Sequence, residues 1–146
     1  PNYADRIAEE FRSIAQLSET NLQLRRQGAL QLERLAADRP LSEAALARLA
    51  AVAPADNDPL VWRSLLEAIA RNRGPAPARL AYAALSHPDP ETRRRACLYL
   101  ENHARPEHSA VLAVSLEERD PRICLAAIRA YAACASAATL RAVRMS

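Results

Sequence analysis

The sequence predicts an all-α protein, and more narrowly an α-solenoid of about four helix pairs followed by a terminal helix. Two observations predict it. First, an aspartate-proline pair recurs at intervals of 31 residues, at Asp58-Pro59, Asp89-Pro90 and Asp120-Pro121. Second, each pair opens an apolar segment of helical spacing, and another such segment fills the gap before the next pair. A repeat made of two helices buries its apolar face only by stacking on its neighbours.

Cap-forming residues, prolines and a glycine mark where the individual helices begin and end. Tyr3, Ile7 and Phe11 start an apolar stripe with helical spacing. Asp58 is expected to accept the free N–H groups of the following turn, and Pro59 suits the first helical position, where no N–H is needed. The helices are expected at about residues 3–17, 22–37, 42–53, 58–72, 76–85, 89–104, 106–118, 120–135 and 137–144.

These helices are expected to form one domain, residues 1–146. The helix pairs are expected at about residues 3–37, 41–72, 76–104 and 106–135, with an extra helix at 137–145. Aligning the second helices on Arg25, Trp62, Arg93 and Cys124 creates columns of small and apolar residues that should face the core. The columns are Leu24, Val61, Thr92, Ile123; Gly28, Leu65, Ala96, Ala127; Ala29, Leu66, Cys97, Ile128; and Leu32, Ile69, Leu100, Tyr131.

The segment at 87–100, His-Pro-Asp-Pro-Glu-Thr-Arg-Arg-Arg-Ala-Cys-Leu-Tyr-Leu, resembles a HEAT repeat, in particular the bacterial HEAT-like type found in phycobilisome lyases. The resemblance extends over roughly residues 20–135 and implies a right-handed α-α superhelix. It also implies that Asp89 and Arg93 belong to a structural ladder between neighbouring repeats. Structural roles are implied for Asp58, Pro59, Asp89, Pro90, Arg93, Asp120 and Pro121.

The composition excludes some function classes and disfavours others. The net charge is +3, with no lysine among the basic residues, and the charges are interspersed, which disfavours a nucleic-acid binder. No uninterrupted apolar run reaches the length of a membrane span, and no signal peptide is evident, so neither is expected. Three cysteines without metal-ligand spacing indicate reduced thiols and a cytoplasmic location.

No residue pattern indicates catalysis, a cofactor or a metal. Only two glycines are present, so there is no glycine-rich phosphate loop. His103 and His108 are read as surface histidines rather than metal ligands, because Pro106 separates their helices. Cys124 lies in a first helical turn that could lower its pKa, but packing is the preferred interpretation. The sequence therefore predicts a protein that is not an enzyme.

Arginines at equivalent places on successive second helices are the candidate binding residues. Arg26, Arg63 and Arg94 stand two residues after the first core column, on the side away from the core. If HEAT-like stacking applies, they form a basic ladder on the concave face, extended by Arg129 and flanked by the exposed leucines Leu30 and Leu98. The alternative is a solvated arginine face that only keeps the molecule soluble.

The leading hypothesis is a non-enzymatic scaffold that binds a protein partner with an acidic segment through this face. The alternatives are a nucleic-acid-binding HEAT module and a bilin-lyase-like accessory protein. Trp62 either packs between repeats or contributes to a binding face, and packing is preferred. The last helix leaves Leu140 and Val143 uncovered, which makes it a candidate surface for self-association.

Overall fold

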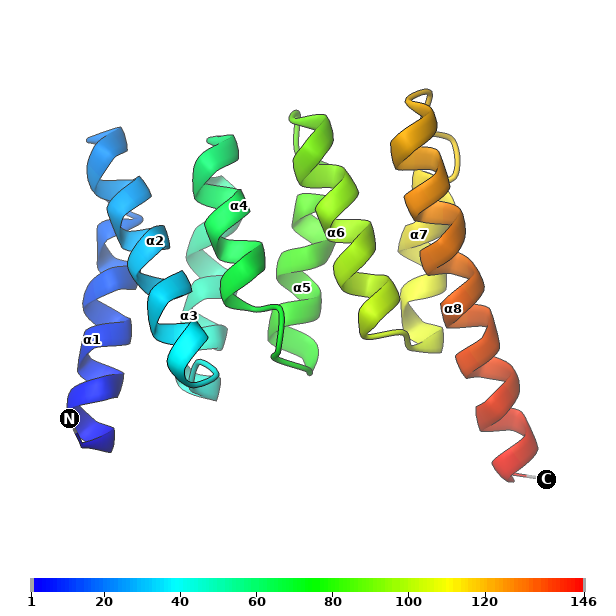
Figure 1. Ribbon diagram of the computed structural model, residues 1–146, viewed down its shortest axis with the longest axis horizontal. Helices are drawn as coiled ribbons and strands as arrows, with labels where there is room; N and C mark the ends of the chain where they lie inside the picture. The colour runs from blue at the N-terminus through cyan, green and yellow to red at the C-terminus, as the bar shows by residue number, and fades with distance from the viewer. Residues whose placement is uncertain (1, 146) are drawn as a thin grey trace. The chain divides into compact units, whose positions relative to one another are not determined.

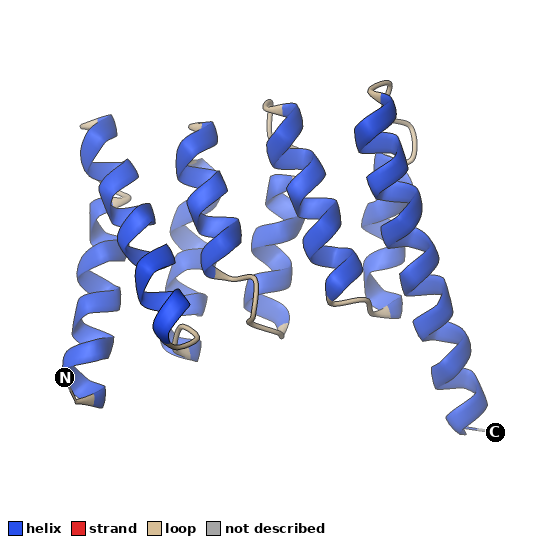
Figure 2. Ribbon diagram, viewed as in Figure 1, coloured by secondary structure: helices blue, strands red, loops and turns tan. Residues whose placement is uncertain are grey.

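The computed structural model describes residues 2–145, and over that span the protein is all-α, with helices, turns and loops but no strand (Figure 2). This confirms that the chain is all-α, whereas the α-solenoid arrangement stays a prediction. The chain divides into two compact units, Pro1–Ala83 and Ala84–Ser146. They are called here the N-terminal and the C-terminal unit. That both belong to a single domain stays a prediction.

The N-terminal unit contains two helix pairs and a fifth helix (Figure 1). Its elements are α1 (Tyr3–Gln16), α2 (Leu22–Asp38), α3 (Glu43–Val52), the 3-10 turn η1 (Ala53–Ala55), α4 (Pro59–Ala68) and α5 (Pro75–Ala84). Helix α1 packs against α2 and α3, and α2 packs against α4. The second helices of the two pairs therefore lie side by side.

The C-terminal unit repeats this arrangement. Its elements are α6 (Pro90–Asn102), the 3-10 turn η2 (Pro106–His108), α7 (Ser109–Ser115) and α8 (Pro121–Met145). Helix α8 packs against both α6 and α7. In this unit too, two second helices are neighbours, with a first helix beside them (Figure 1).

The predicted helix caps are present. The side chain of Asp58 accepts from the backbone N of Val61 at 3.0 Å, and that of Asp89 accepts from the backbone N of Thr92 at 2.9 Å. Pro59 and Pro90 are the first residues of their helices. At the third pair, Asp120 accepts from the backbone N of Arg122 at 2.9 Å.

Two predicted helices are shorter in the structure. Helix α4 ends at Ala68 instead of about Asn72. The turn that follows is attached to the last turn of α2 and to the loop before α3, because Arg71 donates to the carbonyl of Ala36 and the Asn72 amide donates to the carbonyl of Leu41. The segment predicted as a helix over 106–118 is a 3-10 turn followed by the seven-residue α7.

The predicted extra helix at 137–145 is not a separate element. Helix α8 runs without a break for 25 residues, from Pro121 to Met145. The predicted boundary fails because 131–139 contain neither glycine nor proline. The most apolar 18-residue stretch of α8 has a mean hydropathy of 1.6 and is 22% buried, so by length and composition alone this helix could cross a membrane. The expected absence of a membrane span therefore stays a prediction.

A pair of buried charges in α1 organises the N-terminal unit, and the sequence pattern did not indicate it. Arg6 donates to the carbonyls of Leu35 at 2.7 Å and Arg39 at 2.5 Å, and to Glu10 at 3.3 Å. Glu10 in turn accepts from the hydroxyl of Ser42 at 2.7 Å. These bonds hold the end of α2 and the start of α3 against α1, and they satisfy charges that would be costly if buried alone.

The predicted core columns are buried except at the ends of the series. The exceptions in α8 are Ile128, which is 50% exposed, and Tyr131, which is 37% exposed. Their counterparts in α2 and α6 are covered, since α2 packs against α4 and α6 packs against α8. Among the described residues of the C-terminal unit, no further second helix follows α8 to cover this side.

Candidate partner-binding face

The predicted binding residues lie on the second helices of both units. Arg26 and Leu30 belong to α2, and Arg63 belongs to α4. In the C-terminal unit, Arg94 and Leu98 lie on α6 and Arg129 lies on α8. Each unit thus carries part of the predicted set.

Arg26 is not a free cation. Its guanidinium forms two hydrogen bonds with Asp58, from Nε to Oδ2 at 3.0 Å and from Nη2 to Oδ1 at 2.9 Å. The hydrogen bond from Arg26 lowers the pKa of Asp58 below its ordinary value, and the same bond raises the pKa of Arg26. Because Asp58 also caps α4, this ion pair joins α2 to the first turn of α4. Arg26 therefore has a structural role, and its predicted part in partner binding stays a prediction.

Arg94 is also paired within the chain. It donates to Glu91 through Nη2 at 2.6 Å and Nε at 2.9 Å, and Arg95 shares the same carboxylate at 3.2 Å. The hydrogen bond from Arg94 lowers the pKa of Glu91. The Arg94 side chain keeps 35% exposure, so this pair is open to solvent but largely neutralised.

The remaining predicted residues are accessible. Arg63 and Arg129 are exposed, and neither has a carboxylate partner within residues 2–145. Leu30 is 40% exposed and Leu98 is 43% exposed. The chemistry left for a ligand is therefore one cation and one leucine in each unit, Arg63 with Leu30 in the N-terminal unit and Arg129 with Leu98 in the C-terminal unit.

Besides the Arg26–Asp58 pair, two further arginines, called here the ladder arginines, pair with acids that stand outside the aspartate-proline pairs. Arg25 pairs with Asp56 at 3.1 Å, and Arg93 pairs with Glu118 at 2.6 Å. Each of these acids stands two residues before the aspartate of an aspartate-proline pair. Asp89 does not pair with Arg93; it bonds to the backbone and hydroxyl of Thr92. Asp89 thus caps α6, and Arg93 links it to the loop before α8.

The same ladder arginines also hold the loop before their own helix. Arg25 donates through Nη1 to the carbonyls of Glu19 at 3.1 Å and Thr20 at 2.9 Å. Arg93 donates in the same way to the carbonyls of His87 and Pro88, both at 2.9 Å. In both cases the acceptors lie six and five residues earlier in the chain.

Trp62 occupies the equivalent position on α4 and makes the equivalent bond. Its indole Nε1 donates at 2.6 Å to the carbonyl of Asp56, six residues earlier. The side chain is 1% exposed, so the preferred prediction that Trp62 packs is confirmed. Cys124, the fourth member of the column, is too short for this bond; its thiol lies 3.6 Å from the carbonyl of Leu116.

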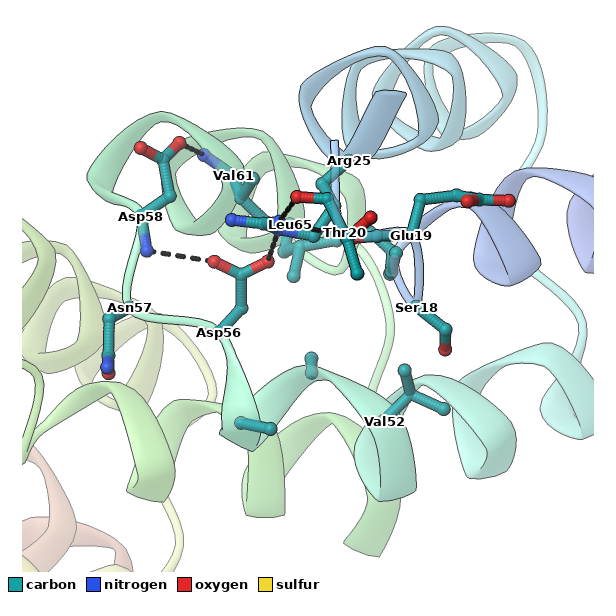
Figure 3. A pocket seen from close by; sticks show the side chains of 13 residues that line it. Ser18, Glu19, Thr20, Arg25, Val52, Asp56, Asn57, Asp58, Val61 and Leu65 are labelled. Atoms are coloured by element: carbon teal, nitrogen blue, oxygen red, sulfur yellow. Dashed lines mark hydrogen bonds and ion pairs between the residues drawn. The ribbon is translucent and has the colours of Figure 1, made fainter. Parts of the chain in front are cut away.

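Recesses accompany these ladder pairs where successive loops meet. In the N-terminal unit a recess of about 480 Å³ is lined by Glu19, Arg25, Asp56 and Asp58 among others (Figure 3). Figure 3 shows Asp56 between Arg25 and the backbone N of Asp58. The Asp56 carboxylate accepts a hydrogen bond from that backbone N at 2.8 Å. The C-terminal unit has a recess of about 460 Å³ beside Arg93. In both, the ladder arginine already has a carboxylate partner.

The described residues offer little for catalysis or metal binding. Within 2–145 no group of three or more His, Cys, Asp or Glu side chains is placed to hold a metal ion. Burial raises the pKa of Cys97 to about 11, and burial also raises the pKa of Cys134, so both thiols are weak nucleophiles. Contrary to the prediction of a surface histidine, His108 is buried, and burial lowers its pKa.

Comparison with known proteins adds no relative. No protein-family model matches the chain, and no curated protein matches it.

Proposed function

We propose that this chain is a non-enzymatic helical-repeat scaffold of the HEAT-like type, which binds a protein partner through the outward faces of its second helices. The support for this proposal is that the two units repeat the same contacts. Both units pack a second helix on a second helix, and both place a ladder arginine on an acid of the next loop. Such regular stacking is the construction principle of α-solenoids, whose outward helix faces form extended binding surfaces.

The observation that carries the proposal is the position of the two exposed leucines. Leu30 and Leu98 occupy the same place in the aligned second helices, each four residues after an outward arginine. These leucines are 40% and 43% exposed, and an exposed leucine at this position recurs in both units. The other two positions in this column are Glu67 and Arg129, both exposed. Within each unit, the second helix that carries the leucine packs against a second helix that carries an exposed arginine: Leu30 on α2 beside Arg63 on α4, and Leu98 on α6 beside Arg129 on α8. A partner that combines apolar side chains with carboxylates therefore fits each unit, through burial of the leucine and pairing with the arginine.

The distribution of charge favours a protein over a nucleic acid. Two of the predicted ladder arginines are already neutralised, by Asp58 and Glu91 respectively. Glu67 adds a negative charge to the same face. Affinity for nucleic acid depends on unpaired cations that replace phosphate counterions, and this face offers few of them.

The test is affinity capture from the native host with a face variant and a control. The face variant carries Leu30→Ser, Leu98→Ser, Arg63→Glu and Arg129→Glu. The control carries Arg12→Glu and Arg48→Glu, which make the same charge change at exposed positions on α1 and α3. Arg26 and Arg94 are left unchanged, because replacing them would disturb ion pairs of the fold.

A partner that binds this face should be recovered equally by the wild type and the control. Recovery by the face variant should fall at least about tenfold, since residues that anchor an interface each contribute 1 kcal/mol or more. Circular dichroism should show equal helix content in the three proteins. Equal recovery of every captured protein by the face variant would reject the proposed face.

A further inference from the structure

The outer side of α8 has the residues of an internal stacking surface but is not covered. Ile128, Tyr131 and Ala135 are exposed on α8. Their counterparts in α2 are Ala29, Leu32 and Ala36, which are 0%, 0% and 5% exposed. Those residues lie in the helix that packs against α4. These three α8 side chains are called here the α8 outer face.

A matching surface lies on α2. Leu24, Gln31 and Leu35 are half-buried there, and they are called here the α2 outer face. Their counterparts in α8 are Ile123, Ala130 and Cys134, which are 2%, 0% and 0% exposed. Helix α8 buries these residues while packing against α6 and α7. The α2 outer face lies beside Gly28, which faces α1, and by register it is the candidate side for receiving the second helix of a preceding pair.

Charges at one end of these two helices are complementary. Helix α8 contains four arginines and no acid, at positions 122, 129, 141 and 144. Aligned with α2, the residue equivalent to Asp38 is 137, so α8 continues for 145 − 137 = 8 residues beyond it, and those residues include Arg141 and Arg144. The corresponding end of α2 bears Asp38, whose side chain is 83% exposed, and the start of α1 adds the exposed Asp5.

Asp5 lies at that same end of the N-terminal unit. Its neighbour Arg6 donates to the carbonyls of Leu35 and Arg39, at the C-terminal end of α2. The extension of α8 thus presents two arginines, of which Arg141 also pairs with Glu107 at 3.1 Å. The equivalent end of the α1 and α2 pair presents Asp5 and Asp38, of which Asp38 also lies 3.7 Å from Arg6. Opposite charges placed in this way favour one orientation of approach.

We propose that the α8 outer face of one chain docks on the α2 outer face of a second copy, so that copies associate head to tail. The contact would repeat the packing of α6 on α8 and of α2 on α4, with second helix against second helix. It rests on the register of the helices and not on the protein partner proposed above, so either proposal can fail alone.

Other occupants fit the α8 outer face less well. Two α8 helices packed on each other would bring together four arginines from each helix and no acid from either. Their like charges would repel. Insertion across a membrane would require α8 to separate from α6 and α7, which bury Ile123, Ala127 and Cys134 on its other side. The head-to-tail contact leaves that packing intact.

A head-to-tail contact of this kind is heterologous, and the number of copies it joins is not limited unless the ring closes. The mean mass should therefore rise steadily with protein concentration instead of stopping at a dimer. Because Arg141, Arg144, Asp5 and Asp38 are exposed, the association should weaken as salt is added.

Analytical ultracentrifugation of two blocked variants and their mixture tests the proposal. The first variant, Ile128→Glu with Ala135→Glu, blocks the α8 outer face at residues that are already exposed. The second, Gln31→Arg with Asp5→Arg, blocks the α2 outer face and reverses a carboxylate. The control, Arg48→Glu, changes an exposed residue of α3 that belongs to neither face.

The wild type and the control should associate with rising concentration. Each blocked variant should remain monomeric at ten times the concentration at which the wild type begins to associate. An equimolar mixture of the two variants should form a dimer and nothing larger, because only one intact pair of faces remains. Equal circular dichroism and melting temperatures would show that the variants are folded.

Three results would overturn the proposal. One is a wild type that stays monomeric at the highest concentration and lowest salt. Another is a dimer of the α2-face variant by itself, which would mean that α8 pairs with α8. The third is sedimentation of the wild type with anionic lipid vesicles, abolished by Ile128→Glu with Ala135→Glu, which would assign the α8 outer face to a membrane surface.

Discussion

At the scale of single residues, neighbouring arginines on α2 have different structural tasks. Arg25 holds the preceding loop through the carbonyls of Glu19 and Thr20 and reaches Asp56 in the next loop. Arg26 reaches Asp58 in the first turn of α4. Planar guanidinium groups suit such two-sided contacts, because their five donors point in fixed directions. Some arginines that the sequence marks as binding residues are therefore already paired within the chain.

Replacing Asp58 with Asn isolates the charge of this pair from its helix cap, since asparagine also caps helices well. The pKa of Asp58 is lowered from its ordinary 3.8 by the hydrogen bond from Arg26. Its charge therefore adds stability above the unfolded pKa, and this contribution is lost as pH falls through the folded pKa. Thermal unfolding should show Asp58→Asn melting a few degrees below the wild type at pH 7, with the two converging as the pH falls through the folded pKa of Asp58.

Asp120→Asn is the matched control for this experiment. Asp120 pairs with Arg122, whose side chain is 75% exposed, so its loss should leave the melting temperature nearly unchanged. A gap between Asp58→Asn and the wild type that persists below the folded pKa of Asp58 would mean that the ion pair is not its cause.

At the scale of elements, α1 and α2 approach each other closely because α2 contains a glycine at the contact. A Cβ added to Gly28 would lie 2.6 Å from the carbonyl oxygen of Ser13 and 2.8 Å from the Cβ of Gln16. The first of these atoms belongs to the backbone of α1 and cannot move aside alone. The absence of a side chain at this position sets the distance between the two helices.

Gly28→Ala should therefore destabilise the protein, although alanine favours a helix by about 1 kcal/mol over glycine. Overpacking of this kind costs about 1–3 kcal/mol, and a net loss of about 1 kcal/mol is expected in urea unfolding. Gln27→Ala, at an exposed position on the same helix, should be neutral or slightly stabilising. A more stable Gly28→Ala variant would show that α1 yields easily.

At the scale of the whole molecule, the buried side chains lie within two compact units, and the end of α8 adds little to either. From Thr139 to Met145 every residue is exposed. The ion pair of Arg141 with Glu107, at 3.1 Å, links this stretch to the rest of the C-terminal unit. Exposed pairs of this kind contribute roughly 0–1 kcal/mol.

A chain ending at Ala137 should therefore keep its free energy of unfolding to within about 1 kcal/mol in urea titration. A chain ending at Ala130 should be strongly destabilised, because it also loses Cys134, which is fully buried. If the chain ending at Ala137 lost several kcal/mol of its free energy of unfolding, the last turns of α8 would have to be counted as part of the core.

The sequence by itself was sufficient to predict an all-α chain, the starts of its helices and most of its core. Those features depend on local chemistry, as where Asp58 and Asp89 cap their helices, and on helical spacing, as at Leu65 and Leu100. The tertiary structure decided which arginines are paired, because Arg26 and Asp58 are 32 residues apart in the chain. It likewise decided that Ile128 is exposed, since burial depends on whether another helix covers the residue and not on the residue's own position in the pattern.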